Sequence, residues 1–280
     1  MNSTTPHQKA SGGQDVRPAT CPRLVSMRIA RFVVDSDPMY GVVDGNDVHV
    51  LAGDPFFQGI KTTGVTHQLD DVRLVAPIIP RSKIIGFGRT YREHAKELGN
   101  EVPNEPLMFL KPNTSVVGHG DPVTLPAFSE EVSFEGELAV VIGRICKDVP
   151  AEKAADVIFG YTVANDLTAR DAQRKDPQWA RAKGFDGACP LGPWIETQLA
   201  DPDDVGIVTR VNGEVRQDGS TNEMIWSVND LVARASEAFT LLPGDVILTG
   251  TPAGVGLVAE GDNVEIEVEG IGTLRSVFRR

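Results

Sequence analysis

The chain is built from short runs of β-branched and apolar residues, each of strand length and each followed by a turn signal. Such runs, bounded by Gly, Pro, Asn or Asp, indicate strands. After residue 80 they span residues 83–87, 138–142, 160–164, 207–211, 245–249 and 263–268. Helical patterns are fewer and span residues 91–98, 151–157 and 228–239. Because no regular crossover helices separate the strands, the sequence predicts a predominantly β (α+β) fold of the sandwich or roll type.

Turn signals and composition divide the chain into three parts. Residues 1–26 are polar and show no periodicity, so we predict a flexible tail. Residues 27–79 alternate β-rich runs at 29–34, 40–43 and 48–51 with turns such as the hairpin-like stretch 44–47, which predicts a small β-rich N-terminal subdomain. Residues 80–280 form the second, larger domain.

The charge balance limits the class of partner. The chain of 280 residues has 27 Lys and Arg against 39 Asp and Glu, a formal net charge of −12. Such an acidic protein is not expected to bind nucleic acid or an anionic membrane. A small anionic substrate remains compatible, since a bound cation reverses the local field.

The cysteines and apolar runs bear on location. Cys21, Cys146 and Cys189 are odd in number and form no Cys-x-x-Cys, which argues against a disulfide framework or a zinc cluster and suits a reducing compartment. The N-terminus lacks the apolar stretch of a secretory signal, and no apolar run approaches the ~20 residues of a membrane span. We therefore expect a cytoplasmic protein.

Several enzyme classes lose support because their motifs are missing. The stretch Gly86-Phe87-Gly88 lacks the third glycine of a dinucleotide fingerprint, and the glycine-rich stretch 250–256 lacks the Lys-Ser/Thr of a Walker loop. Neither Gly-x-Ser-x-Gly nor His-Glu-x-x-His occurs. A serine hydrolase, zinc protease, kinase or NAD enzyme is therefore disfavoured.

Three acids form a candidate metal site. Glu135 and Glu137 precede a buried run and, two residues apart on a strand, should share one face. Two such carboxylates are costly to bury without a cation between them. Asp166 ends a second predicted strand and would complete a set of oxygen ligands, which favours Mg²⁺ or Mn²⁺ over zinc.

Two other interpretations of the glutamate pair remain open at this stage. The first is the solvated face of an edge strand. The second is the carboxylate pair of a glycosidase, although acids two apart on one strand are usually too close together to flank a sugar.

A helix predicted at 91–98 carries a candidate acid–base pair. His94 and Glu97 are three residues apart and so share a face. A carboxylate that fixes the imidazole tautomer is a common arrangement for a general base. An ordinary exposed pair on a charged helix is the alternative. Glycines on both sides of this helix would suit a lid.

Three further polar residues follow the second strand. Arg170, Gln173 and Lys183 offer donors for an anionic or carbonyl-bearing ligand. Taken singly, each is as easily explained as a surface residue.

Taken together, several strings resemble the fumarylacetoacetate hydrolase family. They occur in the family's order, cover roughly residues 80–280, and are GRTYREH (88–94), EPLMFLKP (105–112), EGE (135–137), NDLTARD (165–171), VNGE (211–214) and LPGDVILTGTP (242–252). The resemblance is greatest to the short members: acylpyruvate hydrolases, oxaloacetate decarboxylases and the isomerase/decarboxylases of aromatic-acid degradation.

The resemblance implies a mixed β-sandwich roll, usually a homodimer, with residues 80–280 as the catalytic domain. It implies a divalent metal, Mg²⁺ or Mn²⁺, held by Glu135, Glu137 and Asp166. Residues 84–91 contain no carboxylate, so a fourth acidic ligand found in larger members is missing, which argues against fumarylacetoacetate itself as substrate.

The resemblance also implies roles for the remaining residues. His94 and Glu97 would form a catalytic dyad on a mobile lid helix, and Lys183 would complete the catalytic set. The implied substrate contacts are Arg89, Arg170, Gln173 and Thr251.

Two reactions follow from this site. The first is cleavage of a C–C bond in a small anionic 2-oxo acid, by oxaloacetate decarboxylation or acylpyruvate hydrolysis, through a metal-stabilised enolate. The second, given by the isomerase/decarboxylases of aromatic-acid degradation, moves a proton in a 2-hydroxyhepta-2,4-diene-1,7-dioate isomerase and releases CO₂ in a 5-oxopent-3-ene-1,2,5-tricarboxylate decarboxylase. Within this resemblance, Gln173 in the stretch Arg-Asp-x-Gln is more similar to the cleavage enzymes than to the isomerases of aromatic-acid degradation, which often depart from that pattern. A binding protein without catalysis is disfavoured by the presence of His94, Glu97 and Lys183 together.

Overall fold

The computed structural model describes residues 26–280 except 36, 98 and 100. The predicted flexible tail lies outside the described residues, apart from Ser26, and so does Cys21. The flexibility of that tail stays a prediction.

The largest sheet has twelve strands and runs through the whole molecule. Along its main path the order is β4-β3-β2-β1-β14-β12-β11-β17-β6-β7, while β5 pairs with β1 and β8 pairs with β14. Its strands are β1 (Arg28–Val33), β2 (Met39–Asp44), β3 (Asp47–Leu51), β4 (Thr62–Gln68), β5 (Arg73–Leu74), β6 (Ile84–Gly88), β7 (Leu107–Lys111), β8 (Val116–Val117), β11 (Gly136–Ile142), β12 (Ile158–Asn165), β14 (Cys189–Glu196) and β17 (Val246–Leu248).

Two smaller sheets complete the β structure. A three-stranded sheet has the order β13-β10-β18, and a five-stranded sheet has the order β16-β15-β19-β20-β9. Their strands are β9 (Pro122–Thr124), β10 (Val132–Phe134), β13 (Thr168–Ala169), β15 (Gly206–Val211), β16 (Glu214–Ser220), β18 (Gly256–Leu257), β19 (Asn263–Val268) and β20 (Gly272–Arg279). The five-stranded sheet packs on β11, β12 and β14, which gives the predicted sandwich. The predominantly β fold class is confirmed.

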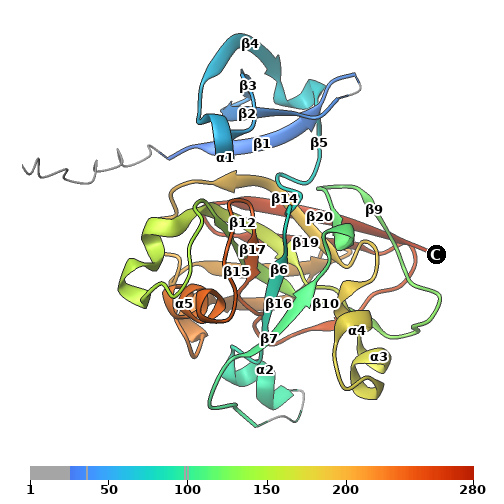
Figure 1. Ribbon diagram of the computed structural model, residues 1–280. Coiled ribbons are helices and arrows are strands. Elements are labelled where there is room, and N and C mark those ends of the chain that lie inside the picture. Colours follow the sequence, from blue (N-terminus) through green and yellow to red (C-terminus); the bar gives the residue numbers. More distant parts are fainter. Residues whose placement is uncertain (1–25, 36, 98, 100) are drawn as a thin grey trace, which may run out of the picture.

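Helices are short and lie at the margins of the sheets (Figure 1). The α-helices are α1 (Pro55–Gln58), α2 (Arg92–Glu97), α3 (Arg170–Lys175), α4 (Ala180–Gly184) and α5 (Val228–Ala238), and the 3₁₀ helices are η1 (Leu69–Asp71), η2 (Asn113–Ser115), η3 (Ala151–Val157) and η4 (Thr221–Glu223). The helix expected at 151–157 is therefore a 3₁₀ helix. It forms a short connector between Pro150 and β12, a setting in which 3₁₀ turns are frequent. Among the described residues, no helix combines the length and apolar character needed to cross a bilayer.

Strand β11 lies at the centre of the core. All seven of its residues are buried, because core clusters cover both of its faces. Leu138 and Val140 belong to the cluster between the sheets, while Ala139 and Val141 belong to a second cluster on the opposite face. Whatever side chains project at the start of this strand are therefore held away from bulk water.

The N-terminal strands extend the large sheet. Strand β1 pairs with β14 through Arg28 opposite Glu196 and Ile29 opposite Ile195. In Figure 1 the N-terminal strands and the helix α2 lie at opposite ends of the molecule. The sequence runs predicted at 29–34, 40–43 and 48–51 correspond to β1, β2 and β3. The division into a subdomain 27–79 and a domain 80–280 stays a prediction.

A glycine in β12 gives a test of this packing. A Cβ added at Gly160 would lie 2.5 Å from the carbonyl oxygen of Glu196, a backbone atom that cannot turn aside. Gly160→Ala should therefore lower the free energy of unfolding by about 1–3 kcal/mol. Gly206→Ala, whose nearest neighbour would be a side-chain oxygen at 3.5 Å, should stay within about 1 kcal/mol of wild type. Urea unfolding followed by circular dichroism measures both, and equal midpoints would contradict the packing described.

Candidate active site

The two predicted glutamates lie where the chain passes from one sheet to another. Strand β10 ends at Phe134 and β11 begins at Gly136, so Glu135 lies in a break and the single continuous strand expected from the sequence is wrong. The break arises because β10 pairs with β13 and β18, whereas β11 pairs with β12 and β17. Glu135 is 4% exposed and Glu137 is 1% exposed, so the solvated edge-strand alternative is also wrong.

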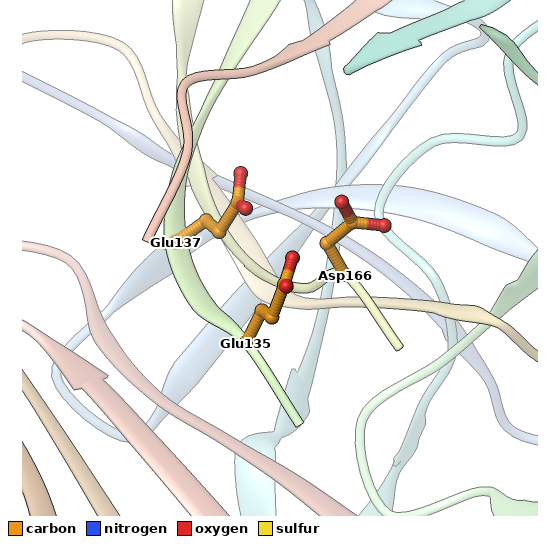
Figure 2. Close-up of side chains that lie close together, drawn as sticks. All are labelled: Glu135, Glu137 and Asp166. Carbon is orange, nitrogen blue, oxygen red and sulfur yellow. The ribbon is translucent and has the colours of Figure 1, made fainter. Parts of the chain in front are cut away.

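Asp166 joins this pair from the end of β12. Asn165 lies opposite Gly136 in the β11–β12 ladder. The Asp166 amide donates to the Glu135 carbonyl at 2.9 Å, and the Glu135 amide donates to Asn165 Oδ1 at 3.0 Å. These bonds bring one carboxylate oxygen of each acid within 4.8 Å of the others. The three side chains, here named the carboxylate triad, point into one common space (Figure 2).

Three buried cations neutralise part of this charge. Lys183 Nζ donates to Glu135 and to Asp166, at 2.6 Å each. Lys111 Nζ lies 2.5 Å from Asp166 Oδ1, and Arg170 Nη2 lies 2.6 Å from Glu135 Oε1. We name Lys111, Arg170 and Lys183 the buried cations.

Glu137 differs from the other two acids. Among the described residues it has no ion-pair partner, and its carboxylate accepts only the amide of Gly250, at 2.8 Å. Burial, followed by the charges of Asp166 and Glu135, raises the pKa of Glu137 well above its ordinary value. Burial opposes ionisation of Glu135 too, but Lys183 and Arg170 hold the pKa of Glu135 far below its usual range.

This arrangement fits a hard divalent cation. An unpaired buried carboxylate beside two ionised ones is the environment that a cation would stabilise. The donor set is all oxygen, as Mg²⁺ and Mn²⁺ prefer. Cys189 is buried nearby, but burial raises the pKa of its thiol to about 12, so it stays protonated and is a poor ligand.

The helix α2 brings His94 and Glu97 to the same site. His94 Nδ1 lies 3.3 Å from Glu97 Oε2, and the His94 side chain is only 7% exposed, so the exposed-pair alternative is wrong for the histidine. The Glu97 carboxylate also accepts the amide of Gly254, at 3.1 and 3.2 Å. Glu97 thus links the predicted lid helix to the glycine-rich loop that follows β17.

Most of the predicted site residues line one cavity of about 380 Å³, which also contains Phe87, Arg174 and Trp179. The predicted residues that line it are Arg89, His94, Glu135, Glu137, Arg170, Gln173, Lys183 and Thr251. Asp166 and Glu97 are not among the residues that line the cavity. Asp166 contacts the lining residue Lys183, and Glu97 contacts the lining residue His94.

Two of the predicted substrate contacts have distinctive local conformations or partners. The Gln173 side chain accepts a hydrogen bond from Arg170, at 3.1 Å. Arg89 adopts a positive φ of 60°, which a residue with a side chain rarely does. Strain of this kind is frequent at functional sites.

Sequence reasoning missed two buried residues that contact this site. Lys111 lies in one of the strings that resemble the family, but the sequence analysis assigns it no role. The feature that could have identified it is a lysine at the end of an apolar strand. Gln217 is 1% exposed and bonds Thr251 and Gly136. It lies in the polar strand β16, where no local pattern marks it as buried.

Comparisons with known proteins identify the family of this chain. A family model described as the fumarylacetoacetate (FAA) hydrolase C-terminal domain matches residues 83–279, and one described as Rv2993c-like, N-terminal, matches residues 27–77. The first covers more than half of the chain. The chain belongs to the fumarylacetoacetate hydrolase family.

Three relatives illustrate the range of the family. Protein Rv2993c of Mycobacterium tuberculosis is 49% identical over 258 residues, which cover 89% of this chain and 96% of that protein. Oxaloacetate tautomerase YisK of Bacillus subtilis is 42% identical over 221 residues, covering 74% and 73%. The crystal structure of 2-hydroxyhepta-2,4-diene-1,7-dioate isomerase from Mycobacterium marinum superposes with a TM-score of 0.84 at 46% identity, covering 91% and 99%.

The environment of His94 predicts its titration. Burial is the main cause that lowers the pKa of His94 below 6.5, while Glu97 acts to raise it. Folding therefore favours the neutral imidazole, and the resulting stability is present above pH 6.5 and is lost as the pH falls through the lowered pKa. NMR titration of metal-free protein should give a pKa below 6.5, lower still in Glu97→Gln. A value above 6.5, or a rise in Glu97→Gln, would contradict the geometry.

Proposed function

We propose that the chain is a divalent-metal-dependent enzyme that acts on a small 2-oxo acid through its enolate. The observation that carries the proposal is the carboxylate triad, in which Glu137 has no cation partner among the described residues, unlike Glu135 and Asp166. Glu135, Glu137 and Asp166 would hold Mg²⁺ or Mn²⁺. When bound, the cation would supply Lewis-acid stabilisation of the negative charge that develops on the substrate's 2-oxo group.

The charges of the site favour a substrate with two carboxylates. The ionised triad and the buried cations carry equal and opposite charges, so a divalent cation, together with Arg89 and Arg174 on the cavity lining, would leave the site with an excess of positive charge. A dianionic 2-oxo acid would offset part of that excess. Arg89, Gln173 and Thr251, which line the cavity, would bind and orient its polar groups.

His94 would move the proton. Its Nδ1 faces the Glu97 carboxylate, so the Nδ1–H tautomer leaves Nε2 unprotonated and free to act as a base. Nε2 takes a proton from the carbon next to the 2-oxo group, and the electrons of that C–H bond form the C=C bond of the enolate. Return of a proton to the oxygen gives the enol, and Lys183 and Arg170 offset the developing charge.

The reaction we favour is this proton transfer, as tautomerisation of oxaloacetate or isomerisation of a related dienedioate. It is supported by the names of two relatives, an oxaloacetate tautomerase and a 2-hydroxyhepta-2,4-diene-1,7-dioate isomerase. C–C cleavage, by oxaloacetate decarboxylation or acylpyruvate hydrolysis, uses the same enolate and is the second candidate. It is supported by the resemblance of the stretch Arg-Asp-x-Gln to the cleavage enzymes of the family, and its Gln173 lines the cavity.

Other expectations stay predictions. These are the homodimeric state, the cytoplasmic location, and the absence of nucleic acid and membrane partners.

Removal of one ligand tests the metal proposal. Glu137→Gln keeps the size of the side chain but removes one of three charges, so the dissociation constant for Mn²⁺ should rise at least about tenfold. Glu130→Gln is the matched control, because Glu130 is exposed and pairs with Arg280 away from the cavity. Titration of free Mn²⁺ by EPR measures both. Equal affinity of Glu137→Gln and wild type would contradict the assignment.

A two-assay comparison separates the candidate reactions. With Mg²⁺ and oxaloacetate, loss of enol absorbance should exceed the uncatalysed rate and outpace pyruvate formation. His94→Gln should lower this tautomerisation by about 10²–10⁴-fold. His49→Gln, in strand β3, should not change it. Pyruvate formation that matches the tautomerisation rate would favour cleavage, and an unaffected His94→Gln would remove the proposed base.

A further inference from the structure

Gln217 is a buried amide that joins the five-stranded sheet to the active site. It lies in β16 and is 1% exposed. Its Oε1 accepts the Gly136 amide at 3.0 Å and the Thr209 hydroxyl at 2.8 Å. Its Nε2 donates to Thr251 Oγ1 at 2.7 Å and to the Pro252 carbonyl at 2.9 Å. Both ends of the amide are therefore fully used.

The hydrogen bonds of Gln217 to Gly136 and Thr251 take the place of the β11–β17 ladder, which has ended at this point. The edge of β11 that faces β17 is paired at Leu138, whose carbonyl accepts the Thr249 amide at 3.2 Å. Two residues earlier, the amide and carbonyl of Gly136 point to the same side, but β17 ends at Leu248. Gln217 accepts from the Gly136 amide, and Thr251 Oγ1 donates to the Gly136 carbonyl at 2.9 Å. Side chains thus satisfy the backbone where the neighbouring strand is absent.

The result is a closed ring of hydrogen bonds around the backbone of one residue, Gly136. It runs from the Gly136 amide to Gln217, from Gln217 to Thr251, and from Thr251 back to the Gly136 carbonyl. We name this ring the amide clamp. Gly136 is the residue between Glu135 and Glu137, and the adjacent Gly250 amide holds the Glu137 carboxylate. The clamp therefore fixes both the backbone that carries the two glutamates and the loop that orients one of them.

We propose that Gln217 is a positioning residue for the metal site. Through the amide clamp it holds Glu135 and Glu137 in the one relative orientation that lets both carboxylates share a cation. The inference rests on the proposed metal-dependent function and adds a residue that touches neither the cation nor the substrate. Partners behind a ligand set typically change metal affinity by about 10–100-fold.

A purely structural role for Gln217 makes a different prediction. Loss of a buried hydrogen-bonded side chain would then lower stability without selectively weakening metal binding. Thr162→Val is the matched control for this effect, because Thr162 is fully buried and its hydroxyl bonds the Trp194 carbonyl, away from the cavity.

The test measures Mn²⁺ affinity by EPR together with the thermal midpoint. Gln217→Met, similar in length but unable to make the four bonds, should raise the Mn²⁺ dissociation constant by about 10–100-fold. Thr162→Val should bind as wild type does, even where its thermal midpoint falls. Thr251→Val breaks the same ring, so Gln217→Met and Thr251→Val combined should weaken binding by less than the product of the single effects.

The outcomes separate this inference from the function on which it rests. A folded Gln217→Met that binds Mn²⁺ as wild type does, or additive effects in the double variant, would overturn the positioning role alone. If Gln217→Met does not fold, the Mn²⁺ affinity of Thr251→Val tests the proposal in its place. A Thr251→Val protein that binds Mn²⁺ as tightly as wild type would overturn the role of the amide clamp. Wild-type protein that binds no Mn²⁺ would overturn both the proposed function and the inference.

Discussion

The site depends on three carboxylates buried within one core. Their negative charges repel one another and therefore require positive charge nearby. Two of the acids meet this requirement inside the chain, since Lys183 bridges Glu135 and Asp166. Within the part of the chain that the structure describes, the Glu137 carboxylate has one hydrogen-bond donor, the amide of Gly250. Its raised pKa is the expected response of a buried acid that lacks a counter-charge. A divalent cation would supply that charge and make the triad a functional centre.

The surrounding fold serves this requirement. The chain changes sheets at Glu135, which lets the two glutamates project from the start of a strand that is buried on both faces. Helices α3 and α4 deliver Arg170 and Lys183 to the same point, and β7 delivers Lys111. On the outer side, Glu97 accepts the amide of Gly254, so the helix α2, whose His94 lines the cavity, is tied to the loop beside it.

Local patterns were enough to predict the strands that are uniform apolar runs, such as β11 and β12, together with the glutamates at the start of β11 and Asp166 at the end of β12. They were not enough for β14, because Pro190 and Pro193 argue against a central strand. That strand changes partners along its length, and its register with β12 shifts, so residues without an amide hydrogen are accommodated. Gln217 could not be predicted from the polar strand β16, because the Gln217 side chain becomes buried only when the two sheets pack together. Residue spacing alone left the roles of Arg170, Gln173 and Lys183 open, and the resemblance to the family supplied the predicted roles.

The central claim is that the carboxylate triad holds a divalent cation. Crystals soaked with Mn²⁺ and measured at the manganese absorption edge test it most directly, because anomalous scattering locates the ion without reference to activity. The account predicts the strongest anomalous peak between Glu135, Glu137 and Asp166, with the carboxylate of Glu137 among its contacts. A map with no peak there, in which Lys183 still bridges Glu135 and Asp166, would contradict it.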